Sequence, residues 1–354
     1  MTLPRKSLAA ILVEQRKDLI VAEVDLPQSL EIGQVLIRVH YSGICGSQLG
    51  EIDGVKGPDR WLPHLLGHEA SATVLSIGPG VKHVAPGDLV VAHWRPGLGI
   101  EAVTAKYLWN GITVNAGWVT TFNQYSVVSE NRLTRVPKST DLSVAALYGC
   151  AVTTGLATIE NKARVRFGDR VVVFGAGGIG LNLVQGAVLA GAAEVIAVDR
   201  FDNRLSLAME VGATKAINAA AEDPFSAINR LLAGERVDIF IDNTGRPEVI
   251  AKGYEILHEK GQLVLVGVPP KGAETALHTL DLHFGKSMTG TAGGESQPAQ
   301  DIPRYMRLFE SRRMQLSRVV TEVASLDKIN HLINGMRSGR TAGRCLVNFT
   351  ELAQ

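Results

Sequence analysis

Cysteine is scarce in this chain, and its scarcity excludes a whole class of small secreted folds. The 354 residues contain three cysteines, Cys45, Cys150 and Cys345. So odd and sparse a set does not build a disulfide framework and is typical of a reducing compartment. The first ten residues also lack the long apolar run of a signal peptide. We therefore expect a cytoplasmic protein.

An excess of either charge sign is also missing. The chain has 36 basic and 35 acidic residues, a formal net charge of +1, and we expect neither nucleic acid nor a membrane as partner. One apolar stretch, Val171 to Val198, is long enough to cross a bilayer. Polar residues interrupt it and its glycines cluster early, so a strand, a turn, a helix and a second strand explain it better.

The length predicts two domains, because a single core stops growing near ~250–300 residues. Short runs rich in β-branched residues occupy the first third, and Gly and Pro separate them. These runs are Val35–His40, Ala72–Ile77 and Leu89–Val91. They predict a distorted sheet or partial barrel.

From about Val152 the pattern changes to alternating strands and helices. The predicted strands are Val171–Phe174, Val195–Val198, Val237–Ile241 and Gln262–Val266, and the predicted helices are 178–190, 203–211, 224–232 and 248–257. Such alternation indicates an α/β fold with a parallel, doubly wound sheet. The tail from about Gly293 adds helical segments at 304–310 and 325–336 and a final strand at 345–349.

A glycine-rich turn between the first of these strands and its helix predicts a dinucleotide site. It consists of Gly175, Ala176, Gly177, Gly178, Ile179 and Gly180. The glycines allow a tight turn, close approach of a pyrophosphate, and close packing of helix on strand. The helix N-terminus then presents free N–H groups to phosphate.

Asp199 ends the next strand, nineteen residues after Gly180. A carboxylate there accepts hydrogen bonds from ribose hydroxyls and repels a 2′-phosphate, so we expect NAD(H) rather than NADP(H). Arg200 and Arg204 could accommodate a 2′-phosphate, so NADP(H) remains open as an alternative cofactor. Thr244 and Val268 follow the carboxyl ends of later strands, where ligands of such sheets bind, and we expect both to contact the cofactor.

Three short motifs carry a further resemblance. They are Gly43-Ile44-Cys45-Gly46-Ser47, Gly67-His68-Glu69 and the segment from Gly149 to Gly155. In order and spacing the chain resembles zinc-containing medium-chain dehydrogenases over nearly its whole length. The resemblance implies that Cys45, His68 and Cys150 hold one catalytic zinc, with Glu69 as a neighbouring carboxylate that ligates transiently. Two thiolates and an imidazole leave a fourth position open, where the metal lowers the pKa of an alcohol oxygen.

The same resemblance implies the architecture. A GroES-like catalytic domain is expected over 1–151 and 293–354, and a Rossmann domain over 152–292, in a homodimer or homotetramer. Ser47 would hydrogen-bond the substrate oxygen, Trp94 would line the substrate pocket, and Arg344 would reach the cofactor pyrophosphate. Cys345, in the terminal strand, is expected to be a core thiol.

The chain departs from its relatives in ways that matter for function. Residues 93–121 contain no cysteine, so the structural zinc of many relatives has no ligands here. The aromatic residues of this lobe are expected to pack a small apolar core instead; they are Trp94, Tyr107, Trp109 and Trp118. An Arg or His found after the first zinc ligand in alcohol dehydrogenases is Gly46 here, which leaves Arg344 to carry the charge at the phosphates.

The usual Asp and His that follow the catalytic Ser are Gln48 and Gly50. Gln48 retains a carbonyl that can accept from the ligating His, but Gly50 cannot relay a proton. Glu51 and His64 are candidate ends of another proton route, against the alternatives of a solvated and a structural side chain.

These features together predict a reversible oxidation of an alcohol by NAD. Gly-Ile-Cys-Gly-Ser resembles the polyol and threonine dehydrogenase branch more than the ethanol branch, and this resemblance implies a polyol, a cyclitol or an amino-sugar alcohol as substrate. Two alternatives remain open: a zinc-free reductase of quinones or activated alkenes with the same fold, and a non-catalytic protein that binds the cofactor. The joint presence of Cys45, His68 and Cys150 argues against the reductase.

Overall fold

The computed structural model of the chain describes residues 4–352 and divides into two compact units. Unit 1 comprises Met1–Cys150, Gln297–Met306 and Val320–Gln354, and unit 2 comprises Ala151–Ser296 and Arg307–Val319. Of the segment 293–354 that is expected in the catalytic domain, residues 293–296 and 307–319 cluster with unit 2, and the domain bounds stay a prediction. Residues 307–319 belong to unit 2 because the backbone N–H of Gln315 donates to Gln185, and Arg318 pairs with Glu210.

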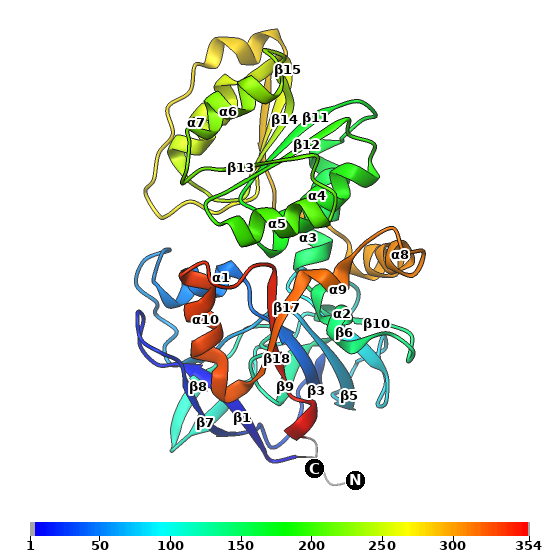
Figure 1. Cartoon of the computed structure of the whole chain (residues 1–354). Coiled ribbons are helices and arrows are strands. Elements are labelled where there is room, and N and C mark those ends of the chain that lie inside the picture. Colours follow the sequence, from blue (N-terminus) through cyan, green and yellow to red (C-terminus); the bar gives the residue numbers. More distant parts are fainter. Residues whose placement is uncertain (1–3, 353–354) are drawn as a thin grey trace. The chain divides into compact units, whose positions relative to one another are not determined.

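Unit 1 is built mainly of strands (Figure 1). Its strands are β1 (Lys6–Leu12), β2 (Ile20–Asp25), β3 (Gln34–Gly43), β4 (His64–Leu65), β5 (Ala70–Ile77), β6 (Leu89–Ala92), β7 (Lys106–Trp109), β8 (Ile112–Asn115), β9 (Tyr125–Ser129), β10 (Leu133–Arg135), β17 (Val320–Ser325) and β18 (Arg344–Asn348). Its helices are α1 (Gly46–Ile52), α2 (Leu142–Leu147) and α10 (Ile329–Arg337), and α8 (Pro298–Glu310) begins in it. Short 3-10 turns are η1 (Glu130–Arg132), η5 (Leu326–Lys328) and η6 (Thr350–Leu352).

The strands of unit 1 form a barrel and a sheet, and the side chains of β3 point into two separate cores. Strands β1, β2, β7, β8 and β4 close into a small barrel, and a second sheet has the order β10-β6-β5-β3-β18-β17, with β9 paired to β3. Because side chains alternate along a strand, Val35 and Ile37 of β3 pack into one core with β5 and α10, while Leu36 packs into another with Tyr107. This confirms the expected β-rich, partly barrel-like first domain.

The prediction that aromatic residues of the lobe pack an apolar core is confirmed for Tyr107 and Trp109. Tyr107 is fully buried, its hydroxyl accepts from the backbone N–H of Val127 at 2.8 Å, and Trp109 packs against the same core. Trp118 is 48% exposed, so its inclusion was wrong. Its ring lies 5.2 Å from the guanidinium of Arg132 instead, a cation–π contact that leaves the ring at the surface.

Unit 2 is a parallel sheet in the order β13-β12-β11-β14-β15-β16. The strands are β11 (Arg170–Phe174), β12 (Glu194–Asp199), β13 (Lys215–Asn218), β14 (Val237–Asp242), β15 (Leu257–Leu265) and β16 (Ser287–Gly290). The helices are α3 (Ala151–Ala157), the π-helical turn η2 (Thr158–Ala163), α4 (Gly178–Leu189), α5 (Asp202–Glu210), α6 (Pro224–Leu231), α7 (Pro247–Glu255), the turns η3 (Thr279–Phe284) and η4 (Gly293–Glu295), and α9 (Leu316–Val319).

Helices cover both faces of this sheet, α4 and α5 on one side and α6 and α7 on the other (Figure 1). The strands are nearly continuous apolar runs because both faces are buried. The predicted doubly wound α/β fold is confirmed. The outer strands β13 and β16 were not predicted, since each is four residues long and only partly buried.

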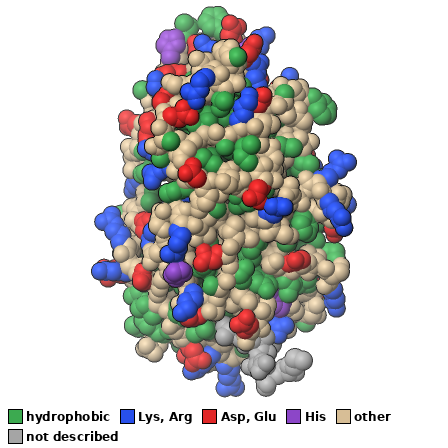
Figure 2. Space-filling view, viewed as in Figure 1, with side chains coloured by type: hydrophobic (Ala, Val, Ile, Leu, Met, Phe, Trp, Pro, Cys, Tyr) green, Lys and Arg blue, Asp and Glu red, His purple; other side chains and the backbone are tan. Residues whose placement is uncertain are grey.

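The distribution of charged side chains on the surface agrees with the balanced composition. Acidic and basic side chains are interspersed over the face shown in Figure 2. Among residues 4–352, no helix is long and apolar enough to cross a membrane.

Candidate functional site

Strand pairing brings the predicted zinc ligands together at one end of the second sheet in unit 1. Strand β3 pairs with β5 so that Ser42 lies opposite Ala70. Cys45 follows the end of β3 and His68 precedes the start of β5, so the antiparallel register places these two ligands side by side. Cys150 follows α2, which packs on β3 and β5, and α2 is fixed by its cap, Asp141, whose carboxylate accepts from two backbone N–H groups.

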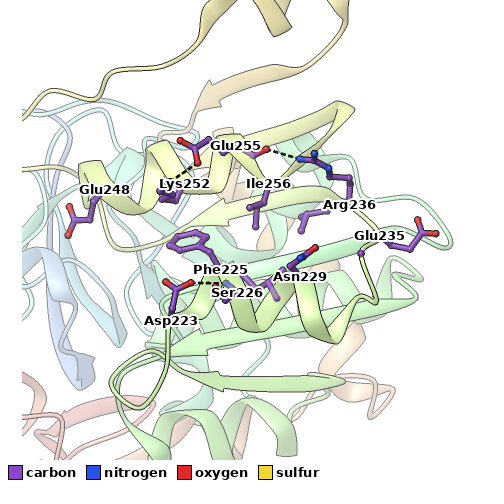
Figure 3. Close-up of a pocket in the computed structure, with 13 residues that line it drawn as sticks. Asp223, Phe225, Ser226, Asn229, Glu235, Arg236, Glu248, Lys252, Glu255 and Ile256 are labelled. Atoms are coloured by element: carbon purple, nitrogen blue, oxygen red, sulfur yellow. Dashed lines mark hydrogen bonds and ion pairs between the residues drawn. The ribbon is translucent and has the colours of Figure 1, made fainter.

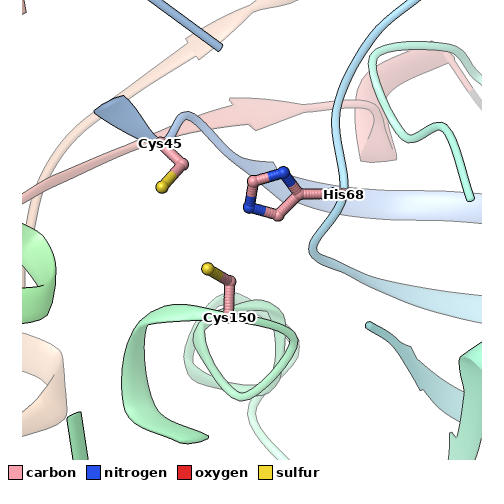
Figure 4. A group of neighbouring side chains, drawn as sticks. All are labelled: Cys45, His68 and Cys150. Carbon is pink, nitrogen blue, oxygen red and sulfur yellow. The ribbon is translucent and has the colours of Figure 1, made fainter. Parts of the chain in front are cut away.

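The three side chains converge. One ligand atom each from Cys45, His68 and Cys150 lies within 4.8 Å of the other two. Figure 4 shows both sulfurs and a ring nitrogen of His68 pointing toward one another. Both cysteines are buried, each 4% exposed. The Nε2 of His68 is buried and has no hydrogen-bond partner among the described residues.

This donor set fits a zinc ion. Two thiolates and one imidazole are a zinc ligand set that leaves a coordination position open for a substrate oxygen. A buried nitrogen without a partner is costly unless something binds it, and a metal at Nε2 of His68 would do so. The two thiolates would balance the charge of the dication.

Gln48 orients the ligating imidazole. Its Oε1 accepts from the backbone N–H of Cys45 at 3.0 Å, and its Nε2 lies 2.5 Å from Nδ1 of His68. Zinc at Nε2 of His68 requires Nδ1 to carry the proton and to donate it. As placed, the amide nitrogen of Gln48 donates to an unprotonated Nδ1. With zinc at Nε2, the amide would have to turn so that its oxygen accepts from the N–H at Nδ1.

The electrostatics of the thiols are linked. The hydrogen bond from Cys150 is the largest influence on the pKa of Cys45 and lowers it; burial opposes this, and the charge of Arg344 adds to it. The same hydrogen bond, together with burial, raises the pKa of Cys150 well above its ordinary value.

Glu69 and Arg344 form a buried ion pair beside these thiols. The Nε of Arg344 donates to Oε1 of Glu69 at 2.6 Å, and the two side chains are 2% and 0% exposed. Burial would lower the pKa of Arg344, but the charges of Glu69, Cys45 and Cys150 outweigh it and hold that pKa well above its ordinary value. The structure thus directs the carboxylate of Glu69 to Arg344 rather than into the group of three ligands.

This ion pair was not predicted from the sequence, which assigned Glu69 to transient zinc ligation and Arg344 to the pyrophosphate. Both roles remain predictions. The only available signal was Arg344 at the start of the final strand. Its contact depends on the pairing of β18 with β3, which no local pattern reveals.

Ser47 lies two residues after Cys45, and Trp94 is hydrogen-bonded to the residue that precedes Cys150. Ser47 is the second residue of α1 and its side chain is exposed. The backbone N–H of Trp94 donates to the carbonyl oxygen of Gly149 at 3.4 Å, next to Cys150. Its indole Nε1 is buried and has no hydrogen-bond partner within the part of the chain that the structure describes.

In unit 2 the glycine-rich turn has the geometry of a phosphate cradle. Gly175 has φ +102°, a conformation that favours glycine, and a Cβ on Gly180 would lie 2.0 Å from the carbonyl oxygen of Gly175. A Cβ on Gly177 would meet nothing within 4 Å, so this side of the turn is open. Gly177 caps α4, which begins at Gly178 and continues through Ile179, and its free N–H groups suit a pyrophosphate.

Asp199 ends β12 beside this turn. Its Oδ2 accepts from the backbone N–H of Ala176 at 2.9 Å, and its Oδ1 accepts from that of Arg200 at 2.8 Å. Arg204 lies 3.7 Å from the same carboxylate. Both arginines stack against the ring of Phe201, with guanidinium-to-ring distances of 5.4 Å for Arg200 and 4.8 Å for Arg204.

Thr244 is held in position by Asp242, a residue that was not predicted from the sequence to belong to the site. Asp242, fully buried at the end of β14, accepts from the hydroxyl of Thr244 at 2.6 Å and from the backbone N–H of Gly245 at 2.9 Å. Burial raises the pKa of Asp242 above its ordinary value despite these bonds. An acid at the last position of a buried strand was the signal available. Val268 is 65% exposed.

A separate hollow lies between α6 and α7 in unit 2, with a volume of about 630 Å³ (Figure 3). Its cations are engaged: Lys252 pairs with Glu255 at 2.7 Å, and Arg236 donates to the carbonyl oxygen of Glu255. Neither the glycine-rich turn nor the zinc ligands line this hollow.

Comparison with known proteins agrees with this geometry. The family model of the alcohol dehydrogenase GroES-like domain matches residues 31–138, and that of the zinc-binding dehydrogenase matches residues 178–311. The chain is 32% identical to an NDMA-dependent alcohol dehydrogenase of Amycolatopsis methanolica, covering 95% of this chain and 97% of that one. It is 31% identical to an S-(hydroxymethyl)glutathione dehydrogenase of Synechocystis sp., covering 95% and 98%. Its fold is similar to benzyl alcohol dehydrogenase from Acinetobacter calcoaceticus, with a TM-score of 0.86, 27% identity and coverage of 98% and 99%.

Proposed function

Because the chain is an alcohol oxidoreductase of the zinc-type medium-chain dehydrogenase family, we propose that it oxidises a polar secondary alcohol with NAD. The substrate class is a polyol, a cyclitol or an amino sugar. The observation that carries the proposal is the convergence of Cys45, His68 and Cys150, with the Nε2 of His68 buried and lacking a hydrogen-bond partner among residues 4–352.

The residues of the chain divide the work. Cys45, His68 and Cys150 would hold zinc, which supplies a charge that lowers the pKa of a hydroxyl and polarises a carbonyl. Gln48 holds the ring of His68 in place. Ser47 is proposed to accept the hydroxyl proton of the substrate. The turn from Gly175 to Gly180 is proposed to bind the pyrophosphate of the dinucleotide.

The zinc content of purified protein tests the centre of this proposal. We expect about one zinc per subunit, lost in Cys150→Ser and retained in Cys345→Ala. Cys345 is the matched control because it is also a buried cysteine of unit 1 but belongs to no convergent group. Zinc that is indifferent to Cys150 would overturn the assignment, and turnover of quinones or enals without zinc would favour the reductase.

Trp94 supports the choice of a polar substrate. Its indole N–H is buried and has no hydrogen-bond partner among the described residues, so a hydroxyl of the substrate can accept from it. Trp94→Phe keeps an aromatic ring and removes the donor. We expect the efficiency ratio of butane-2,3-diol to butan-2-ol to fall about fivefold, the equivalent of about 1 kcal/mol for one hydrogen bond. An unchanged ratio would remove this support for a polyol.

Asp199 supports NAD over NADP. Its carboxylate stands at the strand end where the adenosine ribose binds in such sheets. Asp199→Ala should lower kcat/KM for NAD about 10- to 100-fold, because bonds to a charged acceptor contribute about 1.5–3 kcal/mol. The efficiency with NADP should stay constant or rise, since the repulsion is gone. A parallel loss with both cofactors would mean that Asp199 only supports the turn.

A further inference from the structure

Helix α1 carries two polar side chains on one face. Ser47 and Glu51 are four residues apart, so they lie one above the other on the helix surface. Gly50, between them in sequence, offers no side chain, and the helix has room at this position, where a Cβ would be 3.8 Å from Val55. A proton that leaves the Ser47 end of α1 therefore meets Glu51 as the next group on the helix that can accept it.

Glu51 belongs to a cluster with Asp59 and His64. The Nε2 of His64 lies 2.8 Å from Oδ2 of Asp59 and 4.0 Å from Oε1 of Glu51. The side chains of His64 and Asp59 are 8% and 13% exposed, whereas that of Glu51 is 44% exposed. Glu51 thus connects the buried pair to solvent.

His64 has a hydrogen-bond acceptor at each ring nitrogen. Its Nδ1 faces the carbonyl oxygen of Leu65 at 2.9 Å, and its Nε2 faces the carboxylate of Asp59. The Oδ1 of Asp59 in turn accepts from the backbone N–H of Trp61 at 2.8 Å, which fixes the carboxylate. These contacts hold the ring of His64 in place beside Glu51.

The surroundings of Glu51 adjust its affinity for a proton. Burial raises the pKa of Glu51 above its ordinary value and the charge of Asp59 adds to this, while His64, His68 and Lys56 oppose it. A carboxylate with a raised pKa is a better base near neutral pH. The half-exposed position of Glu51 lets the resulting acid return the proton to water.

We propose that Glu51 is the group that carries the substrate proton out to solvent, and that His64 and Asp59 are positioning residues that set its charge. This rests on the proposed function. Oxidation removes a hydride, transferred to NAD, and one proton from the substrate hydroxyl. The proton passes by Ser47 and bridging water to the carboxylate of Glu51, and from the carboxylic acid to bulk water.

The test compares pH profiles of zinc-loaded parent, Glu51→Gln, His64→Gln and Asp53→Asn. Asp53→Asn is a matched control because it also removes one carboxylate from the end of α1. Asp53 is the C-cap of this helix and pairs with Arg337 rather than with His64. We expect Glu51→Gln to slow alcohol oxidation on the order of 100-fold and exogenous imidazole to restore part of the rate. His64→Gln should shift the acidic limb of the profile to higher pH, since the influence of His64 that lowers the pKa of Glu51 is lost.

A second readout needs no turnover. The carboxyl carbon of Glu51, followed by NMR in the resting protein, should titrate above an ordinary Glu, and higher still in His64→Gln. The proposal is overturned if Glu51→Gln keeps the parent profile and rate, or if Glu51→Gln loses a second zinc that the parent holds. Failure of the zinc-loaded parent to oxidise any alcohol would instead overturn the proposed function, and this inference with it.

Discussion

His93 is a buried histidine that the structure keeps neutral. Its ring is 1% exposed, its Nδ1 donates to the carbonyl oxygen of Arg95 at 2.7 Å, and its Nε2 faces the hydroxyl of Thr134 at 3.0 Å. Burial lowers the pKa of His93 from 6.5 to about 4, and the hydrogen bonds to backbone oxygens only partly oppose this. Because the pKa of His93 is lower in the folded protein than in the unfolded chain, the free energy of unfolding depends on pH through this residue.

We expect the free energy of unfolding to fall as the pH is lowered from 6.5 toward 4, because the unfolded ring binds a proton there and the folded ring does not. The contribution of His93 is fully present above pH 6.5, and about 2 kcal/mol of it is lost at pH 5. Urea unfolding at pH 7 and pH 5 measures this loss. His93→Asn keeps a donor for Arg95 but cannot titrate, so it should unfold with a smaller pH dependence; an equal dependence would contradict the assignment.

The residues of the zinc group could be predicted, and their neighbours could not. Cys45, His68 and Cys150 stand in motifs whose spacing is visible in one dimension. The pairing of Glu69 with Arg344 joins positions 275 apart, and only the β3–β18 ladder brings them together. The contact between His64 and Asp59 spans only five residues, but Asp59 lies in the irregular loop between α1 and β4, so no periodic pattern predicts it.

At the scale of elements, one carboxylate organises a loop of the cysteine-free lobe together with the loop that precedes the lobe. Glu130 is 1% exposed and accepts from the backbone N–H groups of Lys82 at 2.6 Å, His83 at 2.8 Å and Ile100 at 2.8 Å. Burial would raise the pKa of Glu130, but these three donors together lower it. The side chain thus ties two loops to η1 without any metal ligand.

Long periodic elements were predicted well, and short ones were not. The strands β11, β12 and β14 are buried on both faces and appear as apolar runs. The strands β7 and β8 have four residues each and are partly exposed, so their hairpin carries little hydrophobic signal. Their place in the barrel depends on pairing with β2 and β4.

Gly149 shows how tightly the elements around the site pack. A Cβ at this position would lie 2.3 Å from the carbonyl oxygen of Ala92 and 2.6 Å from Cβ of Glu69. Ala92 ends β6 and Glu69 directly precedes β5, so neither atom can move far. Gly149→Ala should therefore destabilise the protein by about 1–3 kcal/mol and lower its zinc occupancy, because Cys150 would shift.

Thermal unfolding and zinc content of Gly149→Ala test this packing. Gly117→Ala is the control, since its Cβ would lie at an ordinary distance of 3.5 Å from the carbonyl oxygen of Val119. The two variants should differ in both measurements. Equal stability would show that the backbone around Glu69 yields, and that the close contacts do not constrain Cys150.

At the scale of the whole molecule, the two groups of ligands come from different units. The zinc ligands all belong to unit 1, and the glycine-rich turn with Asp199 belongs to unit 2. Ligand binding stabilises the part of a protein that it contacts, by an amount that depends on affinity and concentration. Metal and dinucleotide should therefore protect different strands.

We expect removal of zinc by a chelator to increase hydrogen exchange in the segments that carry its ligands, namely the end of β3 with α1, the start of β5, and α2. The amides of β11, β12 and β14 should keep their protection, because local openings differ in free energy across a structure. NADH should protect the turn from Gly175 to Gly180 with or without zinc. Cys150→Ser supplies the control, since a chelator should then change nothing further. A chelator that loosened β11 and β14 as much as β3 would show instead that the metal stabilises the molecule as a single cooperative unit.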